Sequence, residues 1–386
     1  MEELCRAIRA WMFDTALPFW AANGVDREAG GYVELFDQAG RARTDYKRVR
    51  VIGRQIYVFS HAALLGWGEG EALSEHGYRF LTQHAWLGRD GGWARRLDGA
   101  GGVLDATPDL YDVAFVLFAL AWRHRCSRDP ETLAWAHRTL DFAEARLRAP
   151  GGLGFLHEQP ATGWRQQNPH MHMLEAALAW VEATGDERFR RLADELTALF
   201  ADRFFDAKSR TLAEYFDDAL ARAPGDAGRI IEPGHQFEWA WILAQHQRLT
   251  GADCTALSTG LFDFAETHGV DPVTRAVYNT VRDDGQPLDR GSRTWPNTER
   301  MKGAIALFEL TGRDPTAALL ESGGLLLERY LNVKPAGTWI DAFDAEGRPT
   351  VDTVPASTLY HVFLAFAETL RVAPKLGVKI PLGPAG

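Results

Sequence analysis

The chain has 386 residues, of which 46% are hydrophobic and 24% are charged, a composition typical of a soluble globular protein. Its 52 acidic and 42 basic side chains give a net charge of −10. This charge disfavours nucleic acid as a partner, because a protein that binds a polyanion needs a basic surface. The three cysteines are far apart and fit neither a disulfide framework nor a CxxC metal pattern, as expected in the reducing cytoplasm.

The N-terminus does not resemble a targeting segment. Residues 1–20 carry charges throughout and lack the basic and apolar regions of a signal peptide. The longest apolar run, residues 113–122, is about half as long as the roughly 20 residues that a membrane-spanning helix needs. We therefore expect a cytoplasmic protein that does not associate with membranes.

A short pattern recurs six times along the chain. Small residues, often Gly-Gly, precede alternating aromatic and polar residues and then a turn, which is typical of a short β-hairpin. Successive copies begin about 60 residues apart. The copies begin at Gly30, Gly91, Gly151, Arg210, Arg275 and Gly337.

Apolar helical stretches keep the same spacing. Five of them follow a proline, which is favoured in the first turn of a helix, and residues 53–67 occupy the equivalent place in the first repeat without one. More charged, amphipathic segments such as residues 130–149 lie between each apolar stretch and the next hairpin and indicate helices with one solvated face. The prolines are Pro108, Pro169, Pro233, Pro296 and Pro355.

This alternation predicts an all-α fold, an (α/α)6 barrel of six outer and six inner helices with short β-hairpins between them. The alternative is an open solenoid, whose repeats are usually shorter, about 20 to 45 residues. We expect residues 1–373 to form a single barrel domain and residues 374–386, which are rich in Pro and Gly, to form an irregular tail.

Polar residues gather at the start of the predicted inner helices. If these helices run in the same direction, their N-termini meet at one mouth of the barrel, and polar groups there are costly to bury unless they are used or satisfied. The residues concerned are Arg54, Tyr111, Asp112, Asn168, His170, His172, Glu232, His235, Glu238, Trp295, Glu299 and His361.

Helical spacing pairs two of these histidines with carboxylates. Glu175 follows His172 by three residues, as Glu238 follows His235, so each pair shares a helix face and the carboxylate can orient the imidazole. His170 and His172 point about 200° apart on a helix, so at most one faces the cavity. Because no compact cluster completes a coordination sphere, we expect no metal.

Several segments resemble the N-acylglucosamine 2-epimerase family, which also includes mannose isomerase, cellobiose 2-epimerase and proteins described as mannose-6-phosphate isomerase-like. The resemblance covers essentially the whole chain and is closest to the mannose isomerase and mannose-6-phosphate isomerase-like branch. It is carried by GRQIYVFSH (53–61), QNPHMHMLEA (167–176), EPGHQFEWAW (232–241), RTWPNTERMKG (293–303) and PASTLYHVF (355–363).

The resemblance implies roles for nine residues. His235 and His361 match the catalytic histidines of the family, His172 resembles its third histidine, and Arg54 matches the arginine that holds substrate and enediolate oxygens. The matches to substrate-binding or histidine-supporting positions are Asn168, Tyr111, Glu238, Trp295 and Glu299.

The implied chemistry is proton transfer next to a sugar aldehyde, through a cis-enediol or enediolate, without a cofactor. We expect a monosaccharide substrate, a monomer or homodimer, and interconversion of a mannose-type aldose with fructose. Leu359 replaces the aromatic residue of the disaccharide epimerases, which argues against cellobiose. Arg293, Arg300 and Lys302 could meet a phosphate or sulfonate at C6, although such cations are more often surface charges.

Other classes of function stay open from the sequence. A sugar 2-epimerase would use almost the same residues. A carbohydrate hydrolase on the same barrel would need two carboxylates, which Asp112, Glu238 and Glu299 could supply. A non-catalytic sugar-binding barrel would bind without proton exchange.

Overall fold

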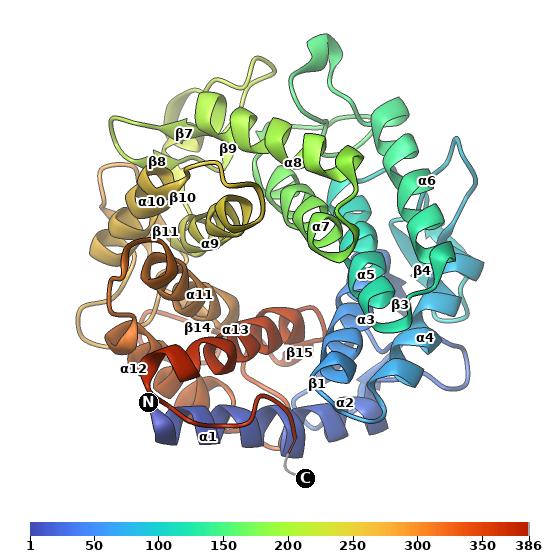
Figure 1. The fold of residues 1–386 in the computed structure, drawn as a ribbon, viewed down its shortest axis with the longest axis horizontal. Coiled ribbons are helices and arrows are strands. Elements are labelled where there is room, and N and C mark those ends of the chain that lie inside the picture. Colours follow the sequence, from blue (N-terminus) through green and yellow to red (C-terminus); the bar gives the residue numbers. More distant parts are fainter. Residues whose placement is uncertain (385–386) are drawn as a thin grey trace.

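The apolar stretches of the sequence form an inner ring of six helices within residues 1–384, the part described by the computed structural model (Figure 1). These helices are buried around most of their circumference; residues 112–123, for example, are all buried. A helix without a polar face has to be covered on every side. The inner helices are α3 (Val49–Leu64), α5 (Leu110–Ser127), α7 (Asn168–Thr184), α9 (Pro233–Thr250), α11 (Thr294–Thr311) and α13 (Thr358–Val372).

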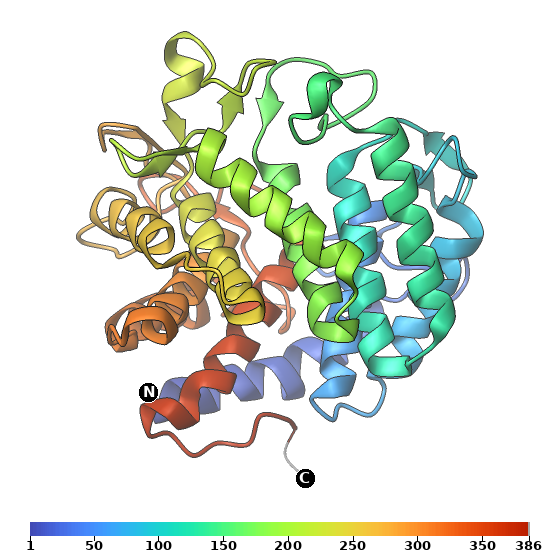
Figure 2. The ribbon, with the colours of Figure 1, turned by 45° about the horizontal axis from the view of Figure 1, so that its top comes forward.

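The amphipathic segments form the outer ring (Figures 1 and 2). In α8 (Glu187–Leu199) the buried residues Phe189, Leu192 and Leu196 recur every three or four positions and pack against α7. Several outer helices end in a π-helical turn. The other outer segments are α1 (Glu2–Ala10) with η1 (Trp11–Ala16) and α2 (Leu17–Asn23), α4 (Gly70–Phe80) with η2 (Leu81–Ala85), α6 (Pro130–Arg146), η4 (Phe200–Phe204) after α8, α10 (Thr255–His268), and α12 (Thr316–Leu325) with η6 (Leu326–Tyr330).

Capping residues fix where several helices begin and end. The side chains of Asp109, Asp129 and Asp186 accept hydrogen bonds from backbone N–H groups in the first turns of α5, α6 and α8. Gly185 and Gly251 end α7 and α9 with φ of 71° and 82°, a conformation that glycine adopts without a steric penalty.

Short antiparallel strands join neighbouring units. β1–β2, β4–β5 and β11–β12 pair as the expected hairpins, whereas β3–β4, β6–β9, β10–β11 and β13–β14 connect different units. β7–β8 pairs across the start of the copy that begins at Arg210, and the copies at Arg210 and Gly337 are closed only by the isolated bridges Phe216–Arg222 and Phe343–Pro349. The strands are β1 (Leu35–Asp37), β2 (Ala42–Arg43), β3 (Tyr46–Arg48), β4 (Arg96–Asp98), β5 (Val103–Asp105), β6 (Arg165–Gln166), β7 (Phe205–Asp206), β8 (Thr211–Leu212), β9 (Tyr215–Phe216), β10 (Ile230–Ile231), β11 (Thr280–Arg282), β12 (Pro287–Asp289), β13 (Ser292–Arg293), β14 (Ala342–Phe343) and β15 (Thr353–Pro355).

The ring of helices is closed. β15 of the last unit pairs with β1 of the first, with Phe36 opposite Val354, and α13 packs against α3. This closure confirms the (α/α)6 barrel and excludes the open solenoid.

Two further details of the predicted repeat are wrong. The segment that begins at Gly151 forms a 3-10 turn, η3 (Pro150–Gly152), and isolated bridges instead of a hairpin. Gly151, Gly152 and Gly154 have φ between 63° and 79°, so the chain bends where an extended strand was expected. In addition, Pro355 ends β15, and α13 begins only at Thr358.

The C-terminal segment folds back onto the barrel. After the 3-10 turn η7 (Ala373–Leu376), residues 377–384 have no regular secondary structure. The other 3-10 turn, η5 (Gly225–Arg229), lies between β9 and β10. Arg9 Nε donates to the carbonyl oxygen of Gly383 at 2.7 Å. Residues 385–386 of the expected tail lie outside the described residues. Across residues 1–384, none of the helices has the length and apolar character needed to cross a membrane.

Candidate active site

All six inner helices contribute their first turns to one cavity of about 250 Å³. This arrangement follows from helices that run in the same direction around the barrel. Eight of the nine residues to which the family resemblance assigned roles line this cavity, and the ninth, Glu299, lies behind His361. The lining residues are Arg54, Tyr111, Asn168, His172, Glu232, His235, Glu238, Arg293, Trp295, Asp341, Pro355, Ser357, Thr358 and His361.

His361 is held by a buried carboxylate and a buried cation. Glu299 Oε1 lies 2.8 Å from His361 Nδ1, and Glu299 Oε2 lies 2.6 Å from Lys302 Nζ. Burial, together with the positive charges of Arg54 and Lys302, lowers the pKa of His361 well below its ordinary value. A neutral imidazole that donates its Nδ1 hydrogen to Glu299 leaves the Nε2 lone pair free to accept a proton.

His235 has the opposite electrostatic environment. Glu214 Oε2 lies 2.9 Å from its Nδ1, and Glu232 Oε2 lies 4.0 Å away. Burial alone would lower the pKa of His235, but the two carboxylates outweigh it and raise the pKa to about 9. His235 is therefore a proton donor at neutral pH.

Trp295 lies between these two histidines. The centre of its indole ring is 5.0 Å from the ring of His235 and 5.5 Å from the ring of His361. The two imidazoles therefore reach the same small space from neighbouring positions, and the aromatic face between them offers a surface for the apolar face of a sugar ring.

His172 is fixed by a third carboxylate. Its Nδ1 lies 3.0 Å from Glu175 Oε2, the contact predicted from their spacing, and the Tyr360 hydroxyl donates to Glu175 at 2.6 Å. Burial lowers the pKa of His172 to about 4. His170, in contrast, points away from the cavity and accepts a hydrogen bond from the Phe155 backbone N–H.

Arg54 is a buried cation that faces the cavity. It donates to the Tyr111 hydroxyl at 2.7 Å and to the carbonyl oxygen of Ser357 at 3.2 Å, and its guanidinium lies 4.2 Å from the centre of the Phe115 ring. Among residues 1–384 it forms no ion pair, and its Nε has no partner. An unpaired, buried cation in the cavity wall is suited to stabilise a developing oxyanion.

Glu238 does not pair with His235, although their spacing predicted it. Its Oε1 has no hydrogen-bond partner among the described residues and lies 3.9 Å from Lys302 Nζ. Burial and the charges of Glu299 and Glu175 raise the pKa of Glu238 well above its ordinary value. This shift favours the protonated carboxyl group, which can donate a hydrogen bond to a substrate oxygen.

The cations near the WPNTE motif have different environments. Arg300 is bound by Glu266 and Glu321, and Lys302 is fully buried beneath Glu299. Only Arg293 reaches the cavity, and its Nη2 lies 2.8 Å from Glu232.

An adjoining polar pocket of about 400 Å³ shares Arg54, Tyr111, Asn168 and Ser357 with the cavity. Its other arginines are each paired with a carboxylate. These pairs are Arg48 with Glu34, Arg50 with Asp109 and Asp112, and Arg95 with Glu158.

Three groups of side chains hold potential metal ligands within 4.8 Å of one another, around His172, His235 and His361. In each group the histidine Nδ1 is already hydrogen-bonded to a carboxylate. These contacts orient the imidazole rings and leave Nε2 of each ring for the cavity.

Sequence reasoning did not predict the roles of three residues that shape the site. Glu214 belongs to the segment between β8 and β9 and holds His235. Lys302 was considered only as a possible phosphate ligand. Asp341 lines the cavity, and its Oδ1 accepts from Thr358 Oγ1 at 2.7 Å. No helical periodicity links these residues to the histidines.

Comparisons with known proteins agree with this geometry. Residues 30–365 match the N-acylglucosamine 2-epimerase family model. The chain is 38% identical over 371 residues to a mannose-6-phosphate isomerase of Rhizobium meliloti (strain 1021), covering 94% of this chain and 95% of the relative. It is 27% identical to a cellobiose 2-epimerase of Bacteroides fragilis (86% and 88% covered).

The fold also matches solved structures. A crystal structure of a D-mannose isomerase superposes with a TM-score of 0.86 at 22% identity, covering 95% of this chain and 97% of that chain. This likeness concerns the fold alone, whereas the family match extends over most of the sequence. The chain therefore belongs to the N-acylglucosamine 2-epimerase family, and it is an enzyme of the sugar isomerase and epimerase type.

Proposed function

We propose that this enzyme interconverts a mannose-type aldose and fructose through a cis-enediol or enediolate, by histidine acid–base catalysis and without a cofactor. The observation that carries the proposal is the pair His235 and His361. They face one cavity on either side of Trp295, and their pKa values are shifted in opposite directions. Such a pair supplies an acid and a base at the same pH.

The reaction begins with opening of the sugar ring. Protonated His235 gives its proton to the ring oxygen and then takes the proton of the anomeric hydroxyl, so the C1–O5 bond breaks, the pyranose becomes an open-chain aldehyde and His235 is protonated again. The carboxylates of Glu214 and Glu232 stabilise the imidazolium before this transfer. The neutral Glu238 donates a hydrogen bond to a sugar hydroxyl, and Asn168, whose Oδ1 has no partner among residues 1–384, accepts one.

Proton transfer between carbons follows. His361 Nε2 takes the proton from C2, the C1–C2 double bond forms, and negative charge develops on O1. Arg54, Tyr111 and His172 surround this oxygen and stabilise its charge. His361 then returns the proton to C1 while the O2 hydrogen passes to O1, which yields the ketose.

The charges around the cavity favour a sugar without a C6 phosphate. Arg293 is engaged by Glu232, and the arginines of the adjoining pocket are engaged by acids. A phosphate bound by these arginines would have to displace a carboxylate, and Arg54, the cation of the wall that forms no ion pair among the described residues, is the group assigned to O1. We therefore expect D-mannose to be a better substrate than mannose 6-phosphate, the sugar in the name of the Rhizobium relative.

A second candidate is 2-epimerisation. His235 and His361 face the same cavity on either side of Trp295, so His235 could return a proton to the opposite face of C2. The cellobiose 2-epimerase relative supports this alternative. The hydrolase alternative has less support, because Asp112 and Glu299 do not line the cavity and are held by Arg50 and Lys302.

One experiment separates these functions. D-mannose, D-fructose, D-glucose, N-acetylglucosamine and mannose 6-phosphate are incubated separately with the enzyme in heavy water, and the products are identified by NMR. Fructose labelled at C1 supports the isomerase, and a C2-labelled epimer supports the epimerase. Unlabelled, unchanged sugars throughout would contradict both. His137 lies on the outer helix α6, so His137→Asn serves as a control that retains activity.

A further inference from the structure

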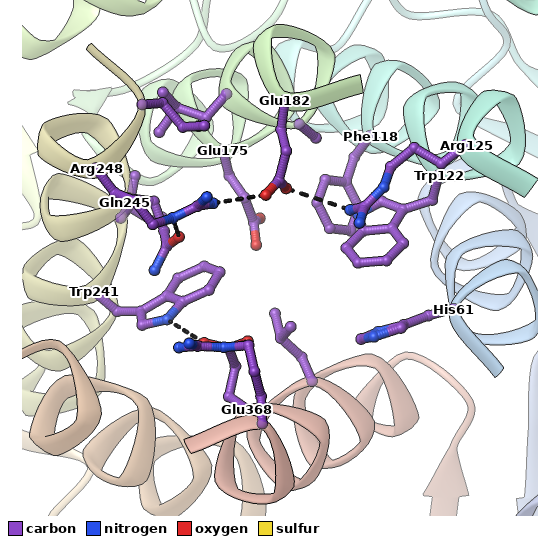
Figure 3. A pocket seen from close by; sticks show the side chains of 16 residues that line it. His61, Phe118, Trp122, Arg125, Glu175, Glu182, Trp241, Gln245, Arg248 and Glu368 are labelled. Atoms are coloured by element: carbon purple, nitrogen blue, oxygen red, sulfur yellow. Dashed lines mark hydrogen bonds and ion pairs between the residues drawn. The ribbon is translucent and has the colours of Figure 1, made fainter. Parts of the chain in front are cut away.

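A second cavity opens where the inner helices end, at the other mouth of the barrel (Figure 3). Its volume is about 220 Å³, close to the 250 Å³ of the candidate active site. A space of this size holds far more than one water molecule. We call it the rear cavity. Its lining residues are His61, Phe118, Trp122, Arg125, Glu175, Leu178, Ala179, Glu182, Trp241, Ile242, Gln245, Arg248, Leu249, Leu364, Glu368 and Arg371.

The charges of the rear cavity are balanced and already paired. Glu182 accepts hydrogen bonds from Arg125 at 3.3 Å and from Arg248 at 2.9 Å (Figure 3). Glu368 accepts a hydrogen bond from Arg371 at 2.8 Å. An ionic ligand would compete with one of these part-exposed pairs for its partner. A neutral ligand with hydroxyl groups can instead hydrogen-bond to the paired groups without separating them.

His61 offers a hydrogen-bond donor to this space. Its Nδ1 lies 2.9 Å from the Tyr57 hydroxyl, which has no other partner among residues 1–384. That hydroxyl is satisfied by donating to Nδ1, so the hydrogen of the neutral ring resides on Nε2. Burial keeps the ring neutral by lowering the pKa of His61 to about 3. Figure 3 shows the ring directed into the cavity.

Two indole rings form walls of the same space. Trp122 and Trp241 lie on opposite sides of the opening (Figure 3). Trp241 Nε1 donates to Glu368 at 3.4 Å, and the Arg125 guanidinium lies 4.2 Å from the centre of the Trp122 ring, contacts that hold both indoles in place. Aromatic faces combined with planar polar side chains suit the C–H faces and hydroxyl groups of a sugar.

Glu175 connects the rear cavity to the candidate active site. It lines the rear cavity, while its Oε2 holds His172 Nδ1 at 3.0 Å and His172 lines the candidate active site. A ligand in the rear cavity that contacts this carboxylate therefore changes the support of a substrate-side histidine.

We propose that the rear cavity binds a neutral monosaccharide as a second ligand, and that this ligand modulates the active site through Glu175. The proposal goes beyond the isomerase reaction and rests on it only for the choice of sugars. The two are tested separately, because the tryptophans of the two cavities differ: Trp295 lines the candidate active site, and Trp122 and Trp241 line the rear cavity. Trp122 serves as the reporter of the rear cavity.

The experiment uses the full chain with His361→Asn, which stops turnover, labelled with 5-fluorotryptophan and studied by ¹⁹F NMR. Signals are assigned with Trp122→Phe and Trp295→Phe. We expect titration with D-mannose or D-fructose to shift both signals, with separate saturation curves. Ala179→Phe fills the rear cavity and should remove only the Trp122 shift, whereas Ala317→Phe, on the exposed face of α12, should leave both.

Three outcomes overturn the proposal. The Trp122 signal stays fixed at sugar concentrations that saturate Trp295; its shift follows the Trp295 curve and persists in Ala179→Phe; or benzene or mannose 6-phosphate shifts it while the neutral sugars do not. A shift at Trp122 with none at Trp295 would refute the proposed function and leave the rear site standing. If Ala179→Phe does not fold, His61→Phe keeps a planar ring without the donor and should weaken the Trp122 response at least tenfold.

Discussion

Glu299 Oε1 lies 2.8 Å from Nδ1 of His361, although the two residues are 62 positions apart in the chain and belong to different helices. This contact fixes the tautomer that presents Nε2 to the cavity. We predict that Glu299→Gln lowers kcat by roughly 100-fold with little change in KM, since acid–base catalysis contributes about 10²- to 10⁴-fold and the amide favours the wrong tautomer. Steady-state kinetics measures this.

Glu309 supplies the matched control, because it lies on α11 like Glu299 and pairs with Arg371 and Lys375 away from the candidate active site. Glu309→Gln should keep the wild-type kcat. An equal loss in both variants would show that Glu299 has no special role in catalysis.

Lys302 is a buried cation that pairs with the Glu299 carboxylate at 2.6 Å and lies 3.9 Å from the carboxyl group of Glu238. Removing one partner of a buried pair leaves an uncompensated charge and costs about 3 to 5 kcal/mol. We predict that Lys302→Met lowers the free energy of unfolding by that amount, as measured by urea denaturation.

The double variant Lys302→Met/Glu299→Gln should regain part of this stability, because the unpaired carboxylate is gone, without regaining activity. If Lys302→Met unfolds at the wild-type urea concentration, the buried pair is not formed as described.

The pH dependence of kcat/KM should report His235. This histidine acts in its protonated form, so activity is retained below its pKa of about 9 and falls as the pH rises through that value. His361 acts in its neutral form, so the acid limb lies well below pH 6.5.

Glu214→Gln tests what sets the basic limb of this pH profile. It removes the negative charge next to His235 Nδ1, so the basic limb should move to lower pH, whereas the exposed Glu346→Gln should not move it. A Glu214→Gln profile that superimposes on the wild type would contradict the assignment.

Arg54 carries the only positive charge on the cavity wall, within residues 1–384, that forms no ion pair. We predict that Arg54→Gln lowers kcat by about 10²- to 10³-fold, because a charge-stabilising donor of the transition state is lost. The exposed Arg43→Gln is the control. A change in KM alone would assign Arg54 to ground-state binding instead.

The sequence predicted most of the barrel because its repeat is long and regular. The period placed His235 and His361 at equivalent ends of two inner helices, and the i,i+3 spacing predicted the contact between His172 and Glu175, which the structure contains. Helical spacing works there because both partners share one helix.

The support of the other two histidines was not predictable in this way. Glu214 reaches His235 from an extended segment 21 residues earlier, and Glu299 reaches His361 from another inner helix. Both contacts depend on how separate units pack. The i,i+3 rule therefore gave the wrong partner for His235, because Glu238 turns instead toward Lys302.

The most direct measurement concerns the proton that His361 transfers. Fructose deuterated at one C1 position is incubated with wild-type, His361→Asn and His137→Asn enzymes, and the loss of deuterium is followed by NMR. We predict loss from only one of the two C1 positions in the wild type and in His137→Asn, and none in His361→Asn, which should still bind the sugar. Exchange by His361→Asn at the wild-type rate would contradict the account.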